Sequence, residues 1–326
     1  MADIVEKILF PVKEEMEKYN QTFDSYMTTD NPLLDNILKD MSKHKGKGMR
    51  PLITILSAKM FGEVQDVTYH LAAAYELFHN ATLIHDDIID ESDTRRGRPS
   101  VYSLFGSRIS VLVGDYVLTN ALISSITTRR IELMEEVFRA ARWLVDGELF
   151  QLYNISLDEI SEINYYNIIK KKTAILFASC AKSGAMTTTD NPQDIKNMED
   201  FGMVVGKCFQ IKDDIFDYIA GDEIGKPRGN DMIEGKLTLP VIHALLSTNN
   251  EEMIEIAKKV KAGEASRGEI DSLVRFTIDN QGIEYAYEMM EKYAAQAQEI
   301  LNQYPDSDVK TALSNYICFV IQRNKQ

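Results

Sequence analysis

Hydrophobic positions recur every three or four residues along almost the whole chain, which is the spacing of amphipathic helices. No segment shows a convincing alternation of the kind that marks a strand. The pattern predicts an all-α fold of about ten or more helices packed as a bundle. The clearest stripes are Leu71, Ala74, Tyr75, Phe78, Thr82 and His85, and then Leu133, Val137, Ala140 and Leu144.

Prolines and glycines fall mainly between these stripes, where helices should start or break. They gather in the segments 45–51, 96–99 and 221–235. None of these segments is long enough to be a linker, and no low-complexity stretch interrupts the chain. We therefore expect residues 1–326 to form a single domain, which is large but within the size that one helical unit can reach.

Composition excludes several classes of protein. Hydrophobic residues make up 44% and charged residues 26% of the chain, ordinary values for a globular protein. The formal net charge of −14 argues against nucleic-acid binding, which requires a basic face. The sequence shows no apolar run of transmembrane length and no signal peptide, so we expect a cytoplasmic protein without a transmembrane segment. Its three cysteines are too widely spaced for a zinc site.

The first group of chemically notable residues is an acidic cluster in an apolar helix. Asp86, Asp87 and Asp90 lie within Leu83–Asp90, and the spacing of four residues puts Asp86 and Asp90 on one helix face. Carboxylates gathered beside leucine and isoleucine repel one another unless a cation lies between them. Carboxylate oxygens on a rigid element, with positions left for phosphate and water, suit Mg²⁺.

The same D-D-x-x-D spacing returns at Asp213, Asp214 and Asp217, again in an apolar helix. Each cluster is followed by glycines and basic residues: Arg95 and Arg96 after the first, and Lys226 and Lys236 after the second. A single cluster would suit a solvated acidic turn equally well. Two copies with basic followers indicate a site for Mg²⁺ and diphosphate, in which guanidinium and ammonium groups hold the remaining phosphate oxygens.

In their order along the chain, these motifs resemble those of the trans-isoprenyl diphosphate synthases, the polyprenyl synthetase family. The family carries D-D-x-x-D followed by R-R-G, and a second D-D-x-x-D followed by G-K and K-T-L-P. Here the last motif reads Lys236-Leu237-Thr238-Leu239-Pro240, with one extra leucine. The matching segments run from about residue 45 to residue 240. The resemblance implies a single large helical bundle around a central apolar cavity, and a homodimer.

Further site residues follow from the resemblance. Lys47 and Arg50 match the family segment that binds the diphosphate of isopentenyl diphosphate, although Gly48 replaces a basic residue of that segment. The family places a histidine at His79, where it would reach the same diphosphate. Lys172 and Thr173 match a pair that contacts the allylic diphosphate, and Gln210 matches a glutamine near the allylic carbon.

The implied reaction is head-to-tail condensation of isopentenyl diphosphate onto an allylic diphosphate, which we expect to be farnesyl or geranyl diphosphate. The small Ala81, five residues before Asp86, leaves room where short-chain synthases often have an aromatic floor. We therefore expect a long-chain all-trans product of about thirty to fifty carbons, since one isoprene unit spans roughly one helical turn. A farnesyl or geranylgeranyl product is the alternative, because Phe78 or Tyr75 would shorten the tunnel if either closes it.

Other classes of protein remain open from the sequence. The chain could be one subunit of a heteromeric synthase, although a non-catalytic subunit typically lacks aspartates that are all present here. A terpene cyclase or a head-to-head synthase would share the two metal-binding clusters. The paired Arg95-Arg96 and the Lys47 and Arg50 site for a second diphosphate argue against it. A purely structural helical bundle is the last alternative.

Overall fold

Helices make up nearly all of the fold. The computed structural model describes residues 2–44, 46–219 and 229–323. The elements are α1 (Ala2–Leu9), η1 (Phe10–Val12), α2 (Lys13–Tyr26), α3 (Pro32–Lys43), α4 (Met49–Lys59), α5 (Asp66–Ile89), β1 (Thr94–Arg95), β2 (Arg98–Pro99), α6 (Val101–Thr127), α7 (Ile131–Ile155), α8 (Glu162–Ile169), η2 (Lys170–Ala174), α9 (Ile175–Met186), α10 (Pro192–Ile219), α11 (Asn230–Ile233), α12 (Leu239–Thr248), α13 (Glu251–Ala262), α14 (Arg267–Asp279), α15 (Gly282–Leu301) and α16 (Asp308–Gln322). The expected all-α class is confirmed.

Several helices begin where a side chain satisfies their free amide groups. Asn31 accepts hydrogen bonds from the amides of Leu33 and Leu34 at the start of α3, and Pro32 occupies its first turn. Ser100 caps α6, and Ser161 caps α8 by accepting from the amide of Asn164. These caps set where α6 and α8 start, and both helices flank the acidic clusters.

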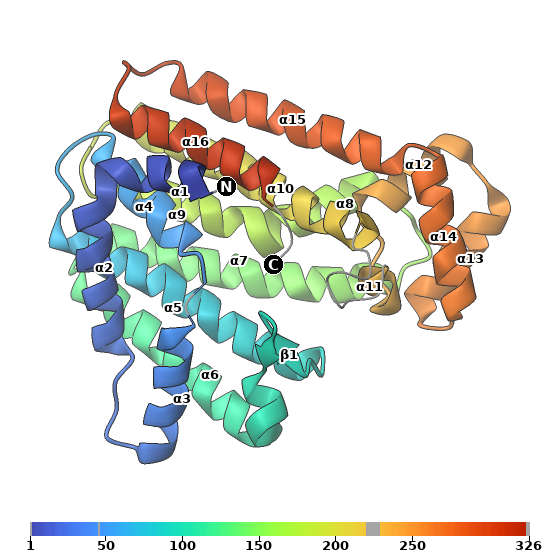
Figure 1. The fold of residues 1–326 in the computed structure, drawn as a ribbon, viewed down its shortest axis with the longest axis horizontal. Helices are drawn as coiled ribbons and strands as arrows, with labels where there is room; N and C mark the ends of the chain where they lie inside the picture. The colour runs from blue at the N-terminus through green and yellow to red at the C-terminus, as the bar shows by residue number, and fades with distance from the viewer. Residues whose placement is uncertain (1, 45, 220–228, 324–326) are drawn as a thin grey trace.

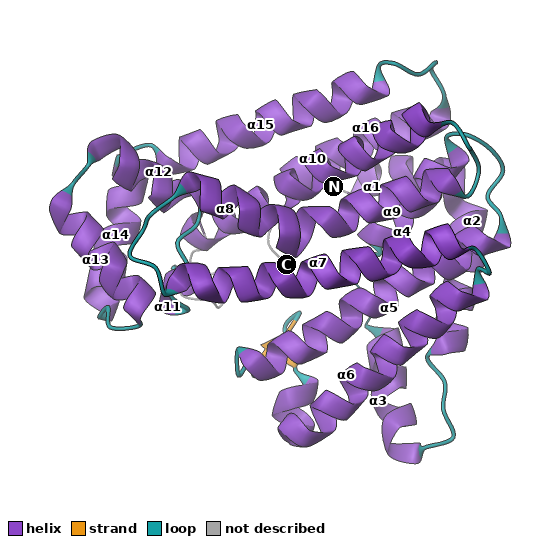
Figure 2. Cartoon of the chain, turned by 180° about the vertical axis from the view of Figure 1, so that it is seen from behind, coloured by secondary structure: helices purple, strands orange, loops and turns teal. Residues whose placement is uncertain are grey.

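The helices α5, α7, α9 and α10 run through the middle of the molecule, and α15 and α16 cover one side of them (Figure 1). Seen from behind, α6 lies along α5 and α7 on the opposite side (Figure 2). A large hydrophobic core fills the space between these helices. A second, smaller core lies at one end, among α12, α13 and α14. Ile160, Leu237 and Ile283 pack against both cores. The organisation of residues 1–326 as a single domain stays a prediction.

Two features differ from the sequence-based expectations. Thr94–Arg95 and Arg98–Pro99 form a two-stranded antiparallel hairpin, too short to show as a strand pattern. Helix α6 is long and apolar enough to cross a membrane by length and composition, and we expected no such segment. That signal is weak, because it comes from a single helix and helices that pack in a helical core can pass the same test; 44% of the most apolar window of α6 is buried.

The turn η2 is a π-helical turn between α8 and α9, and it carries Lys172 and Thr173. Single π-turns of this kind often occur at functional sites. Two glycines allow neighbouring helices to approach it closely: a Cβ atom on Gly147 of α7 would lie 2.8 Å from the backbone nitrogen of Lys172, and one on Gly206 of α10 would lie 2.5 Å from the Cα of Ala174. The backbone of this turn is therefore held from both sides.

Candidate active site

The first acidic cluster lies in the last turn of α5. Asp87 is 4% exposed and accepts a hydrogen bond from Nε of Arg95 at 2.8 Å. Asp86 is more open, and burial raises the pKa of its carboxyl to about 6, with Glu148 adding to the rise and Lys172 opposing it. Asp90 is exposed at the end of the helix. Asp86 and Asp90 are therefore the open carboxylates of this cluster, whereas Asp87 holds the hairpin.

In the second cluster, each of the three aspartates has different partners. Asp213 forms an ion pair with Arg323 at 2.8 Å, and its side chain stays 42% exposed. The carboxylate of Asp217 accepts hydrogen bonds from the backbone amides of Asn230 and Asp231, at 3.0 and 3.1 Å. It thereby anchors the first residues of α11 to α10.

Asp214 is 3% exposed and lies deepest in the second cluster. Its Oδ2 accepts a hydrogen bond from Tyr165 at 2.6 Å, and its Oδ1 accepts one from Gln210 at 2.9 Å. Burial raises the pKa of Asp214 to about 7, while these two hydrogen bonds act in the opposite direction. Thr173 completes the group, because its hydroxyl donates to Oε1 of Gln210 at 2.7 Å.

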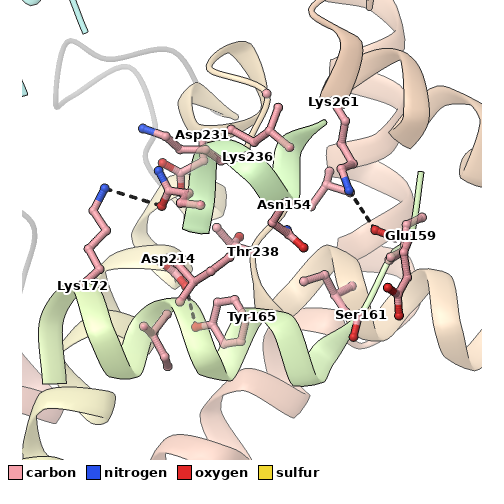
Figure 3. Close-up of a pocket in the computed structure, with 18 of the residues that line it drawn as sticks. Asn154, Glu159, Ser161, Tyr165, Lys172, Asp214, Asp231, Lys236, Thr238 and Lys261 are labelled. Carbon is pink, nitrogen blue, oxygen red and sulfur yellow. Dashed lines mark hydrogen bonds between the residues drawn. The ribbon is translucent and has the colours of Figure 1, made fainter. Parts of the chain in front are cut away.

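Tyr165, Gln210 and Asp214 line a cavity of about 140 Å³. Figure 3 shows Lys172 and Lys236 at one end of this cavity and Lys261 at the other, with Asp214 and Tyr165 between them. The ammonium group of Lys172 lies 2.7 Å from Glu148. The cavity walls also include Gln210 and Asp231.

Two lysines connect the acidic clusters electrostatically. Lys172 lines the cavity beside Asp214, and its charge opposes the rise in the pKa of Asp86 that burial causes. Burial alone would lower the pKa of Lys236, but Glu234, Asp90 and Asp231 raise it above its usual value. Each lysine therefore lies in the wall of the cavity that Asp214 borders and is close enough to one aspartate of the first cluster for their charges to interact.

A separate basic region begins at the loop before α4. The guanidinium group of Arg50 lies 5.0 Å from the ring centre of Phe177, and the ammonium group of Lys47 lies 5.1 Å from that of Phe319. Burial lowers the pKa of Lys47, and the nearby Arg323 lowers it further. The region is therefore cationic and partly shielded from water, as a diphosphate site requires.

His79 and Arg96 belong to the same region. Burial lowers the pKa of His79 well below its usual range, and the charges of Arg50, Arg96 and Arg95 lower it further. His79 is therefore neutral at pH 7 and can donate one hydrogen bond. The guanidinium group of Arg96 lies against Gly46, where a Cβ atom would be 2.7 Å from Nη2. This contact brings the hairpin against the loop of Lys47.

The structure brings most of the expected site residues together around these two regions. Lys226 lies outside the described residues. Arg95 contacts Asp87, and its role toward a diphosphate stays a prediction. Sequence reasoning missed Arg323, Asp231, Tyr165 and Glu148 as site residues. Asp231 follows the second cluster closely, but Arg323 comes more than a hundred residues later without a motif, so that only the folded chain reveals it.

Among the described residues, no group of three His, Cys, Asp or Glu side chains would hold a metal ion by itself. This arrangement still suits Mg²⁺, which usually binds through one or two carboxylates together with phosphate oxygens and water. Asp86 and Asp90 on one wall and the half-exposed Asp213 on the other offer such carboxylates. The donor set therefore fits a metal ion that binds together with a diphosphate.

Comparison with known proteins agrees with this geometry. The Polyprenyl synthetase family model matches residues 31–277. Octaprenyl diphosphate synthase from Haemophilus influenzae is 32% identical over 323 residues, which cover 99% of this chain and 97% of that protein.

Two crystal structures are also similar. The geranylgeranyl pyrophosphate synthase from Bacteroides thetaiotaomicron has a TM-score of 0.87 and 39% identity, covering 98% of this chain and 100% of that one. The polyprenyl synthase from Caulobacter crescentus CB15, complexed with calcium and isoprenyl diphosphate, has a TM-score of 0.91 and 29% identity, with 98% of each chain covered. Fold and site together define an all-α prenyltransferase. The chain belongs to the polyprenyl synthetase family.

Proposed function

We propose that this protein condenses isopentenyl diphosphate head-to-tail with an allylic diphosphate, farnesyl or geranyl, in the presence of Mg²⁺. The observation that carries the proposal is the pairing of two sites. One is the pair of acidic clusters with the cavity that Asp214, Lys172 and Lys236 line, and the other is the basic region of Lys47, Arg50, His79 and Arg96. The first site suits the diphosphate of the allylic substrate, which leaves during the reaction. The basic region suits the diphosphate of isopentenyl diphosphate, which is bound but not cleaved.

In this mechanism, each group of residues has a separate task. Lys172 and Lys236 bind oxygens of the allylic diphosphate, and neutral His79 donates to the diphosphate of isopentenyl diphosphate. Mg²⁺ held by Asp86, Asp90 and Asp213 would neutralise the charge that develops on the departing diphosphate. The apolar core beneath α5 keeps water from the allylic cation. The released diphosphate is the base that takes up the proton.

The direct test is an assay of the purified protein with farnesyl diphosphate, Mg²⁺ and labelled isopentenyl diphosphate. We expect diphosphate release that requires isopentenyl diphosphate, and a lengthened prenyl chain in the organic extract. Release without isopentenyl diphosphate would indicate a cyclase. No release under any of these conditions would refute the proposed activity.

We propose a long-chain product. Ala81 is fully enclosed in the main core and carries only a methyl group, and the octaprenyl diphosphate synthase relative is named for a long product. One observation favours the shorter alternative: Tyr75, which lies deeper along α5, hydrogen-bonds Ser183 of α9 at 2.7 Å and so spans two of the core helices. The geranylgeranyl pyrophosphate synthase structure agrees with that alternative. Product chromatography distinguishes the two.

The pH dependence of metal binding follows from the raised pKa of Asp86. A proton and Mg²⁺ compete for this carboxylate, so the metal affinity should rise about tenfold per pH unit below pH 6 and level off above pH 7. Because the folded-state pKa is raised, protonated Asp86 stabilises the metal-free protein at low pH, and this stability is lost as the pH rises through 6.

Melting temperatures of the metal-free protein between pH 4 and pH 8 should therefore fall through pH 6, and Mg²⁺ with inorganic diphosphate should reverse the fall. The variant Asp86→Asn is the control, because it has no proton to lose at this position. A metal affinity that does not change between pH 5 and pH 7 would contradict the prediction.

We propose that the protein is a homodimer that pairs through α6 and α7. These neighbouring helices expose many large apolar side chains, and an apolar patch of this extent usually marks an interface. Leu112 and Leu149 are 64% and 61% exposed. The others are Leu104, Phe105, Val111, Leu122, Ile123, Ile126, Ile131, Phe138, Trp143, Val145, Leu152 and Tyr153.

The substitution Leu112→Glu should weaken the dimer, because it buries a charge in an apolar interface. Light scattering at assay concentration should show the wild-type mass at twice 37.0 kDa and the variant shifted toward the monomer. Ile163→Glu is the matched control, since Ile163 is exposed on α8 and lies outside this face. An active wild-type monomer would refute the dimer.

A further inference from the structure

Tyr165 is a buried residue of α8 that lines the cavity beside Asp214 (Figure 3). It is 4% exposed, and its ring packs edge-on against Tyr166 with the ring centres 5.3 Å apart. Its hydroxyl donates a hydrogen bond of 2.6 Å to Oδ2 of Asp214. The hydroxyl is therefore fixed in direction, because the ring cannot turn and the acceptor is itself enclosed.

The other oxygen of Asp214 orients Gln210. The amide nitrogen of Gln210 faces Asp214 and donates to its Oδ1 at 2.9 Å, while Oδ2 accepts from Tyr165. The amide oxygen then faces the opposite way and accepts from the hydroxyl of Thr173 at 2.7 Å. Because the only proton of that hydroxyl is used, the oxygen of Thr173 has only lone pairs left for other contacts.

A continuous chain of hydrogen bonds thus runs from Tyr165 through Asp214 and Gln210 to Thr173. It connects three elements, α8, α10 and η2. The backbone of η2 is already held by the close approach of Gly147 and Gly206. The hydrogen bonds also fix the side chains, so that the oxygen atoms of Gln210 and Thr173 point in a defined direction.

We propose that Tyr165 is a positioning residue for the condensation, which acts through Asp214 to hold Gln210 and Thr173 against the ionising allylic substrate. The inference rests on the proposed function. Oxygen lone pairs fixed in place stabilise a developing allylic cation without having to reorient during the reaction. Without the hydroxyl of Tyr165, the carboxylate of Asp214 is free to turn, and Gln210 and Thr173 lose their common orientation.

The first test is the variant Tyr165→Phe, which removes one oxygen atom and keeps the ring. We expect kcat to fall about 10²-fold, the size expected for a displacement of roughly 1 Å near the reacting atoms. KM for isopentenyl diphosphate should stay the same, because its basic site shares no residue with the chain.

Tyr166→Phe is the matched control for this experiment. It removes a hydroxyl from the neighbouring residue, whose ring packs against Tyr293, and in the described part of the chain Asp214 accepts from Tyr165 and not from Tyr166. We expect nearly wild-type kcat for this variant. Melting temperatures of both variants separate a loss of positioning from a loss of fold. A Tyr165→Phe protein that does not fold would overturn the proposal, because the hydroxyl would then support the whole domain.

A double-mutant cycle distinguishes positioning from an independent effect. Thr173→Val removes the far end of the chain, and Tyr165→Phe in that background should cost much less than it does in the wild type. If the fall in kcat of the double variant equals the product of the falls in the two single variants, the proposal is overturned. A Tyr165→Phe enzyme with unchanged kcat, or with only KM changed, would also overturn it. If the wild-type protein itself shows no activity that depends on isopentenyl diphosphate, the proposed function fails instead.

Discussion

Replacing Asp86 with asparagine will lower the rate of condensation by about 10³-fold. Asparagine keeps the size of the side chain but removes the charge that holds a metal ion against the departing diphosphate, and this electrostatic stabilisation is usually the largest catalytic contribution. Asp86 is the suitable target because Asp87 is occupied by Arg95, whereas Asp86 is more exposed and lies close enough to Lys172 for their charges to interact. Release of diphosphate at saturating substrate measures the effect.

Asp66→Asn is the matched control for this change. Asp66 lies in the first turn of α5, the same helix, and is exposed far from the cavity. The control should keep wild-type activity with only a slightly weaker helix start. If Asp86→Asn retains more than about a tenth of the wild-type rate, then Asp86 is not a ligand that the reaction depends on.

The second large effect concerns the length of the product. Ala81 lies five residues before Asp86, slightly more than one helical turn deeper, and is 1% exposed in the main core. Ala81→Phe should place a ring where the lengthening chain must pass, because a packed core has no spare volume for it. The allylic diphosphate should still ionise, since the substitution changes no metal ligand and no contact with a diphosphate. The products should shorten to about fifteen or twenty carbons.

Chromatography of the dephosphorylated products, with a short allylic primer, gives the answer directly. Overpacking should also lower the stability of Ala81→Phe by about 1–3 kcal/mol, so its melting temperature is measured beside it. Ala81→Ser is the control, because it adds little volume and should leave the product length unchanged. An active Ala81→Phe enzyme that still makes the long product would show that the tunnel lies elsewhere.

Much of the site could be predicted from the sequence, because the relevant residues repeat a local pattern. Asp86 and Asp90, like Asp213 and Asp217, share a helix face through spacing alone, and the surrounding isoleucines place them in buried helices. The basic residues that follow each cluster were visible for the same reason. What the spacing did not reveal is which aspartates stay open: Asp87, Asp214 and Asp217 are buried, whereas Asp86, Asp90 and Asp213 keep more exposure.

Only the folded chain determines contacts between residues that are distant in sequence. Arg323 reaches Asp213 because α16 packs against α10, and Tyr165 reaches Asp214 because α8 runs into η2, which packs against the same helix. Helical periodicity is a local property that follows from 3.6 residues per turn, so the sequence by itself determined the all-α class and the two acidic clusters. The partner of each side chain depends on how the helices pack, and this only the tertiary structure decided, because burial and hydrogen bonding are properties of the assembled core.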